Sequence, residues 1–193
     1  MNELNLQDPK LHTLLLGIDL DLAARARSAG CKHKDCDGTL HSARYPRKAA
    51  LAMPHVEESD RDDIKRFSFC CERCRRRTTP ASVRFFGRRV YPAVLVLVLS
   101  AMRNGVTGSR ASELRETFGV ARRTLERWRH WWRELFVKTP FWNYARGRFM
   151  PVLDYSALPE GLINRFQATR VEERLVQCLR FLGPLTAPGG HGI

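Results

Sequence analysis

The 193-residue chain lacks a long hydrophobic run. Its longest apolar run covers residues 93–99 and is extended by Ala101 and Met102, whereas a membrane-spanning helix needs about 20 apolar residues. Residues 1–9 carry two acidic residues and no basic one, the reverse of a secretory signal peptide. We therefore expect a cytoplasmic protein with no membrane partner.

Sequence signatures of common enzyme classes are also missing. The chain has no HExxH pair, no nucleophile elbow, no phosphate-binding loop and no cluster of carboxylates. These absences argue against zinc peptidases, hydrolases with a serine nucleophile and nucleotide-hydrolysing enzymes. We expect a protein that is not an enzyme.

Acidic residues are in short supply relative to basic ones. The chain has 33 Lys and Arg against 20 Asp and Glu, which gives a formal net charge of +13. Such an excess attracts polyanions. Nucleic acid is the commonest partner of this kind, and an anionic membrane surface is the second.

The cysteines are unevenly distributed, because five of the six lie between residues 31 and 74. Clustered cysteines in a reducing compartment bind metals more often than they form disulfides. Cys31 and Cys36 have an x4 spacing, Cys71 and Cys74 have an x2 spacing, and short strands are expected at 39–45 and 66–70. Two such knuckles on a small sheet predict a zinc ribbon holding one Zn²⁺.

The ligand set has alternatives. Cys70 adjoins Cys71 but is expected on the opposite face of the strand, and His33 has the spacing to replace Cys31. A further alternative is that the cysteines are thiols that bind no metal. Four thiolates leave no coordination position for water, so the predicted role of the zinc is structural. Cys178 is expected to be a small core residue.

Basic residues also gather after the second knuckle. Residues 65–89 contain nine Lys and Arg and one acid, Glu72. Arginine matches the oxygens of a phosphate with a planar fork, so this stretch predicts contacts with a nucleic-acid backbone. A solvated charged surface is the alternative. The predicted DNA contacts here are Arg75, Arg76, Arg77, Arg88 and Arg89.

Residues 90–137 are expected to be helical. The apolar block 94–102 predicts a helix buried on all sides, with a buried strand as the alternative. A short helix over 109–118, a turn at Gly119-Val120 and a second helix over 121–135 then predict a helix-turn-helix. Arg115 lies where the helices cross, so its side chain must tilt outward or the helices must cross further apart.

The second of these helices is amphipathic. One side is apolar and is expected to form the core, with Leu125, Trp128, Trp131, Trp132 and Leu135. The other side is basic. In a helix-turn-helix the start of the second helix enters the major groove of DNA, which makes Arg122, Arg123, Thr124 and Arg127 the predicted base contacts. An ordinary helix pair with a solvated basic face is the alternative.

The chain is therefore predicted to be mainly α with a small β zinc ribbon. Four segments are expected: a helical lead-in over 1–30, in which Asp19 caps a helix and Gly30 ends it; the zinc ribbon over 31–89; the helix-turn-helix domain over 90–137; and a C-terminal helical extension over 138–193. In the extension, Thr169 and Glu172 predict a capping box, and the residues after 186 are expected to be disordered.

The order of these motifs resembles the DNA-binding half of zinc-ribbon transposases from bacterial insertion sequences. The residues that carry the resemblance are Phe69 to Cys74, Arg77 to Pro80 with Ser82 to Phe85, and Gly119 to Thr124. The resemblance covers residues 20–135 and implies zinc bound by Cys31, Cys36, Cys71 and Cys74. The x4 first knuckle and the long gap between knuckles depart from the pattern, and residues 136–193 are too short a segment to form the catalytic domain of such transposases.

These features predict a zinc-stabilised, sequence-specific protein that binds double-stranded DNA in the nucleoid. The expected role is an accessory or regulatory component of a bacterial mobile element, whose partner is a recombinase, a transposase or a second copy of the chain. The alternatives are a stand-alone transcriptional regulator and an RNA- or ribosome-associated zinc protein.

Overall fold

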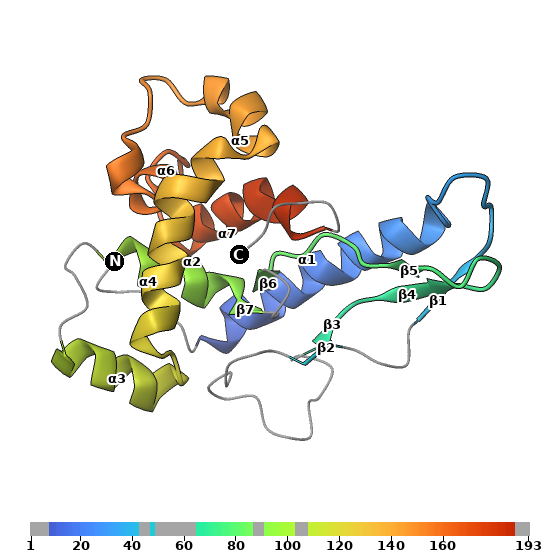
Figure 1. Ribbon diagram of the computed structural model, residues 1–193, viewed down its shortest axis with the longest axis horizontal. Coiled ribbons are helices and arrows are strands. Elements are labelled where there is room, and N and C mark those ends of the chain that lie inside the picture. Colours follow the sequence, from blue (N-terminus) through green and yellow to red (C-terminus); the bar gives the residue numbers. More distant parts are fainter. Residues whose placement is uncertain (1–7, 43–46, 49–64, 87–90, 103–107, 188–193) are drawn as a thin grey trace.

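The arrangement of the chain is given by a computed structural model, which describes residues 8–42, 47–48, 65–86, 91–102 and 108–187 (Figure 1). Arg88, Arg89 and nearly all of the tail expected to be disordered lie outside these residues. Helices dominate, and the strands are short and antiparallel. The prediction of a mainly α protein with a small β part is confirmed.

Helix α2, Ala93–Ala101, lies at the centre of the larger hydrophobic core. All nine of its residues are buried, so the prediction of a helix that is apolar all round is confirmed. Such a helix needs neighbours on every side. It contacts α4 (Arg122–His130), α6 (Glu160–Ile163), α7 (Val171–Leu182) and the hairpin of β6 (Phe85–Phe86) and β7 (Tyr91–Pro92). Figure 1 shows α2 enclosed between these elements.

Helix α1, Pro9–Ser28, belongs to two cores. Leu11, Leu15 and Ile18 pack into the larger core, whereas Ala23, further along the helix, packs into a second core around the cysteines. The N-cap is Asp8, whose carboxylate accepts a hydrogen bond from the Lys10 amide at 2.9 Å. The prediction that Asp19 caps a helix is therefore wrong, because Asp19 lies inside α1.

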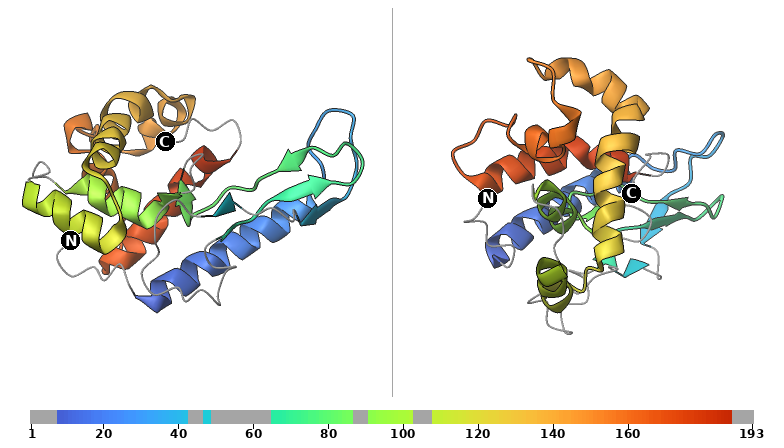
Figure 2. Two further views of the ribbon diagram at one scale, coloured as in Figure 1. Left: turned by 60° about the horizontal axis from the view of Figure 1, so that its bottom comes forward. Right: turned by 60° about the vertical axis from the view of Figure 1, so that its left-hand side comes forward.

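Two strand pairs and one three-stranded sheet make up the β structure. The three-stranded sheet has the order β1-β4-β5, and the hairpins pair β2 with β3 and β6 with β7. The left-hand view of Figure 2 shows α1 running beside the three-stranded sheet. The strands are β1 Leu40–Ser42, β2 Arg47–Lys48, β3 Lys65–Arg66, β4 Phe69–Cys71, β5 Arg77–Thr78, β6 Phe85–Phe86 and β7 Tyr91–Pro92.

Helix α3, Gly108–Phe118, is followed by a tight turn and by α4, Arg122–His130. Gly119 in the turn has φ +64°, a conformation that glycine adopts without strain. On α4 and just beyond it, Leu125, Trp128, Trp131 and Trp132 are buried, as their spacing predicts. Arg115 is exposed, so its side chain does tilt outward.

Leu135 was also expected in the core, but it is half exposed. The reason is a π-helical turn over Trp131–Leu135, in which the Phe136 amide donates to the carbonyl of Trp131. A π-helical turn holds more residues than an α-helical one, so the 100° spacing of an α-helical wheel no longer applies. Leu135 is therefore rotated away from the tryptophans.

The C-terminal part consists of short helices that pack onto the larger core. In α7, Leu175, Leu179, Leu182 and Cys178 are buried, so the predicted role of Cys178 is confirmed. The capping box is wrong, because the N-cap is Arg170, which forms no side-chain cap. The elements are 3-10 turn η2 Phe136–Lys138, α5 Pro140–Ala145, η3 Arg146–Arg148, η4 Tyr155–Ala157, α6 Glu160–Ile163, α7 Val171–Leu182 and η5 Gly183–Thr186.

Candidate metal centre and basic surfaces

Four cysteine side chains meet at the end of α1. Cys31 and Cys36 come from the loop after α1, Cys71 ends β4, and Cys74 lies in the turn after it. All four sulfurs lie within 4.8 Å of one another, although the two pairs are 35 or more residues apart in the chain. These are the four residues that the knuckle spacing predicts.

The sulfur positions fit a tetrahedral metal ion. The Sγ atoms of Cys31 and Cys74 are 3.6 Å apart, and those of Cys36 and Cys71 are also 3.6 Å apart. A tetrahedron with metal–sulfur bonds of about 2.3 Å has sulfur–sulfur edges of about 3.8 Å. The cysteines form no disulfide, so four sulfur atoms are available as metal ligands, and two of their separations match the edges of such a tetrahedron.

Backbone hydrogen bonds shape both knuckles. The Cys31 amide donates to the carbonyl of Gly38, which closes the first knuckle into a loop. In the second knuckle the Cys71 amide donates to the Arg76 carbonyl and the Arg75 amide donates to the Cys71 carbonyl. The four candidate ligands are therefore held by local turns that the short β1-β4-β5 sheet brings together, and we call this sheet with its two turns the ribbon.

The thiols differ in acidity. Hydrogen bonding from the Cys74 backbone, opposed by burial, lowers the pKa of Cys71 to about 7. At Cys31 the backbone of His33 acts to lower the pKa, but burial and the neighbouring thiols raise it to about 12. Four adjacent thiols thus do not all ionise at neutral pH on their own. A bound divalent cation supplies the charge that stabilises four thiolates.

Neither alternative ligand belongs to the cluster. The Sγ atom of Cys70 contacts the carbonyl of Arg75 at 3.4 Å, because alternate residues of β4 face opposite sides. His33 contributes its backbone carbonyl to the first knuckle, where it accepts a hydrogen bond from the Cys36 amide. The sulfur set is therefore Cys31, Cys36, Cys71 and Cys74.

Gly38 is a residue of this site that the sequence analysis missed. A Cβ atom at this position would lie 2.6 Å from the Cys71 Sγ atom and 2.7 Å from the Cβ atom of Arg73. Both distances are too short for any real contact, and a sulfur that binds a metal ion would not be free to move aside. Only glycine fits between the two knuckles.

We expect Gly38→Ala to weaken metal binding and to destabilise the ribbon by about 1–3 kcal/mol, the usual cost of overpacking. The measurements are a competition titration with a chromogenic chelator and a thermal melt. Gly147→Ala is the matched control, because a Cβ atom there meets nothing within 4 Å. Equal metal affinity in the Gly38 and Gly147 variants would contradict this packing argument.

The start of α4 presents four predicted DNA contacts to solvent. Arg122, Arg123 and Arg127 are exposed, and Thr124 is half-buried. The Arg122 guanidinium pairs with Glu126 at 2.8 Å, one helical turn away. The guanidinium of Arg127 donates to the Tyr91 hydroxyl at 2.6 Å and lies over the Tyr91 ring. Arg127 is thus held in place, whereas the Arg123 side chain forms no hydrogen bond or ion pair with the rest of the described chain.

The basic stretch after the second knuckle divides into two groups. Arg75, Arg76 and Arg77 are exposed at the end of the ribbon. Arg66 and Arg84 are internal, with only 6% of each residue exposed. Counting the whole stretch as a phosphate-binding surface is therefore wrong for these two arginines.

Arg84 is paired with Asp19, a role that no local sequence pattern signals. The Asp19 carboxylate accepts hydrogen bonds from the Ser82 hydroxyl at 2.6 Å, the Val83 amide at 2.7 Å and the Arg84 Nε at 3.0 Å. The Ser82 amide in turn donates to the Thr186 hydroxyl at 2.8 Å. This buried network joins α1, the segment before β6 and the C-terminal turn η5.

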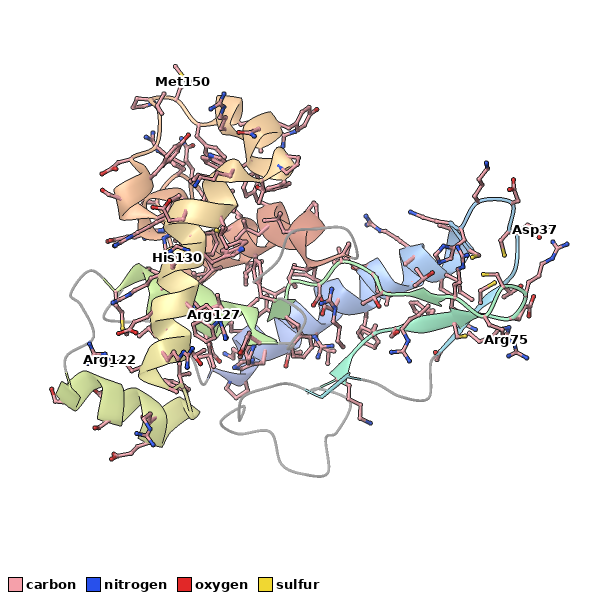
Figure 3. The ribbon with its side chains drawn as sticks, in the orientation of Figure 1. Asp37, Arg75, Arg122, Arg127, His130 and Met150 are labelled. Atoms are coloured by element: carbon pink, nitrogen blue, oxygen red, sulfur yellow. The ribbon has the colours of Figure 1, made fainter. Side chains whose placement is uncertain are left out.

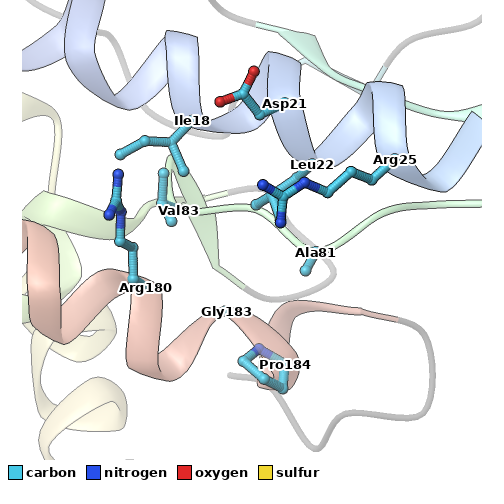
Figure 4. A pocket seen from close by; sticks show the side chains of 9 residues that line it. All are labelled: Ile18, Asp21, Leu22, Arg25, Ala81, Val83, Arg180, Gly183 and Pro184. Atoms are coloured by element: carbon cyan, nitrogen blue, oxygen red, sulfur yellow. The ribbon is translucent and has the colours of Figure 1, made fainter.

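A groove lies beside this network, where α1 faces α7 (Figure 4). It encloses about 390 Å³ over an apolar floor that includes Ile18 and Val83. Arg25 of α1 and Arg180 of α7 lie on its two sides. None of the predicted site residues lines it.

No helix within the described ranges combines the length and the apolar character needed to cross a membrane. Comparisons of the chain with protein-family models, with curated proteins and with solved structures gave no match. The resemblance to transposase DNA-binding regions is therefore carried by the sequence motifs alone.

Proposed function

We propose that the protein is a zinc-stabilised protein that binds double-stranded DNA, with α3 and α4 acting as a helix-turn-helix and α4 lying in the major groove. The observation that carries the proposal is the basic, solvent-facing start of α4 on a helix whose other side is anchored in the core by Leu125 and Trp128. A rigidly held helix with exposed arginines at its N-terminal end suits groove binding.

The positions of the tryptophans support duplex rather than single-stranded nucleic acid. Proteins that bind single strands stack the bases on exposed aromatic rings. All four tryptophans of this chain are buried: Trp128, Trp131, Trp132 and Trp142. They stabilise the core and are not available for stacking.

Zinc is the metal that this site suits best. Four thiolates at tetrahedral spacing are typical of structural zinc, and no open position remains for a catalytic water. We further propose that the protein serves a bacterial mobile element as an accessory or regulatory component, without enzymatic activity of its own. Its protein partner would be a recombinase, a transposase or a second copy of the chain.

The direct test is a competition between duplex and single-stranded DNA over a range of salt concentrations. We expect tighter binding to the duplex and an affinity that falls steeply with salt, since each phosphate contact releases counterions. A preference for single strands or RNA would favour the alternative of an RNA-associated zinc protein. Absence of binding to any nucleic acid would overturn the proposal.

Arg123→Ala is expected to weaken binding to the preferred DNA site by about 1–3 kcal/mol, the usual contribution of a base-contacting arginine. The measurement is fluorescence anisotropy on the preferred duplex and on a scrambled one. Arg133→Ala is the control, because it removes an equal charge beyond the end of α4. An equal loss of affinity for both duplexes would show that Arg123 contacts a phosphate rather than a base.

A further inference from the structure

Arg75 has a backbone conformation that arginine adopts at a cost. Its φ angle is +57°, in the left-handed region where glycine is the favoured residue. The turn needs this conformation because the Arg75 amide donates to the Cys71 carbonyl and thereby closes the second knuckle. Arginine offers the turn nothing that glycine does not, so its presence points to a role for the side chain.

The surroundings of Arg75 carry a net positive charge even when the negative charge of the metal site is included. We call residues 32–37 and 72–77 the ribbon tip. Within it, Asp37 is paired with Arg73, and Glu72 is paired with His41. Five exposed bases have no ion pair among the described residues: Lys32, Lys34, Arg75, Arg76 and Arg77.

The negative charge that these bases face is smaller. Four thiolates around a divalent cation leave a formal charge of −2, and two carboxylates add two more: Asp35, and Glu72, whose partner His41 is charged only when protonated. Five positive charges exceed this total. The tip therefore stays electropositive and is not merely neutralised by its own metal centre.

The ribbon tip is far from α4. Helix α1 has 20 residues and is thus about 30 Å long, and its two ends lie in the two different cores. Figure 3 shows Arg75 at the end of the ribbon, away from Arg122 and Arg127. A length of about 30 Å corresponds to roughly nine base pairs of duplex at 3.4 Å each.

We propose that the ribbon tip is a second phosphate-binding site, which contacts the DNA backbone about one helical turn away from the α4 contact, with Arg75 as its principal residue. This inference rests on the proposed function. It adds that the protein requires a duplex long enough to reach both sites, and that the zinc centre shapes a contact surface rather than only stabilising the fold.

The test compares Arg75→Gly with the unmodified protein on two DNA hairpins that share one sequence, with stems of about 10 and about 24 base pairs. Loss of one phosphate contact corresponds to a salt slope of about −0.9, which at 0.1 M salt is about an eightfold change in affinity. We expect this loss on the long stem, with a shallower salt dependence, and little change on the short one. The metal content should be unchanged. The melting temperature should be unchanged or higher, because glycine adopts the left-handed backbone conformation at this position without strain.

Two further variants make the result specific. Arg75→Lys keeps the charge and the strained conformation and should restore most of the affinity for the long stem. Arg148→Ala removes an exposed charge from η3, outside the ribbon, and should leave the ratio between the two stems unchanged. If Arg75→Gly binds the long stem as tightly as the unmodified protein, the second site is refuted while DNA binding stands. If the unmodified protein binds neither stem, the proposed function itself fails.

Discussion

Cys71→Ser should release the metal ion and unfold the ribbon while the rest of the protein stays folded. Among the described residues, the second core buries Ala23, Leu40 and Phe69 besides two cysteines, with Ala26 and Phe67 packed against them. This is too little apolar area to hold a fold of this kind. In small domains of this sort the free energy of metal binding is the free energy of folding. The larger core shares no residue with it and should survive.

The measurements are metal content per chain, limited proteolysis and a thermal melt. We expect about one zinc per chain before the substitution, none after it, and new cleavage sites confined to the ribbon and the C-terminal part of α1. Acidification and chelators should have the same effect, because protons and chelators compete with the sulfurs for the ion.

Cys70→Ser is the matched control for this experiment. It makes the same chemical change one residue earlier, on the side of β4 that faces away from the cluster. It should keep the metal and the melting temperature of the unmodified protein. Wild-type metal content in the Cys71→Ser protein would show that the four sulfurs do not form the metal centre.

The sequence predicted those features that depend on neighbours in the chain or on one strong constraint. The x4 and x2 spacings identify the four sulfurs because a tetrahedral ion accepts few arrangements. The block that becomes α2 is apolar on every side, so it could only be central. The spacing of the tryptophans on α4 and just after it correctly predicted which side of the helix is buried. The prediction failed at Leu135, because the π-helical turn rotates this residue away from that side.

The features that the sequence did not reveal depend on contacts between distant residues. Asp19 and Arg84 are 65 residues apart, and the hydrogen bond from Arg66 to the Thr186 carbonyl spans 120 residues. A charged residue in a helix or in a basic stretch looks exposed when only its neighbours are considered. Gly38 was missed for a related reason, because its importance comes from a sulfur on another strand.

The buried pair leads to the second large effect that we expect. Asp19→Ala should destabilise the protein by about 3–5 kcal/mol, because it removes the Asp19 carboxylate from beside the buried charge of Arg84. Only 2% of the Asp19 side chain and 5% of the Arg84 side chain are exposed. In a chain of this size the melting temperature should fall by roughly 10 °C.

Two further variants test whether the loss of stability comes from breaking a buried ion pair rather than from removing any carboxylate. Glu126→Ala breaks the exposed pair with Arg122 and should cost only about 0.3–0.5 kcal/mol. The double variant Asp19→Ala, Arg84→Met removes both buried charges and should recover much of the stability, since an apolar side chain no longer demands a partner. If Asp19→Ala melts within about 1 °C of the unmodified protein, Asp19 and Arg84 do not form the buried pair described here.

The same pair links the two proposed DNA contacts mechanically. Asp19 lies on α1 between the part that packs into the larger core and the part that packs into the second core. Its carboxylate also accepts a hydrogen bond from the segment that precedes β6. Loosening this junction should leave each contact intact but let the ribbon tip move relative to α4. We therefore expect Asp19→Ala, studied at a temperature where it is folded, to lose affinity for the long stem more than for the short one. An equal loss on both stems would mean that the junction contributes stability alone.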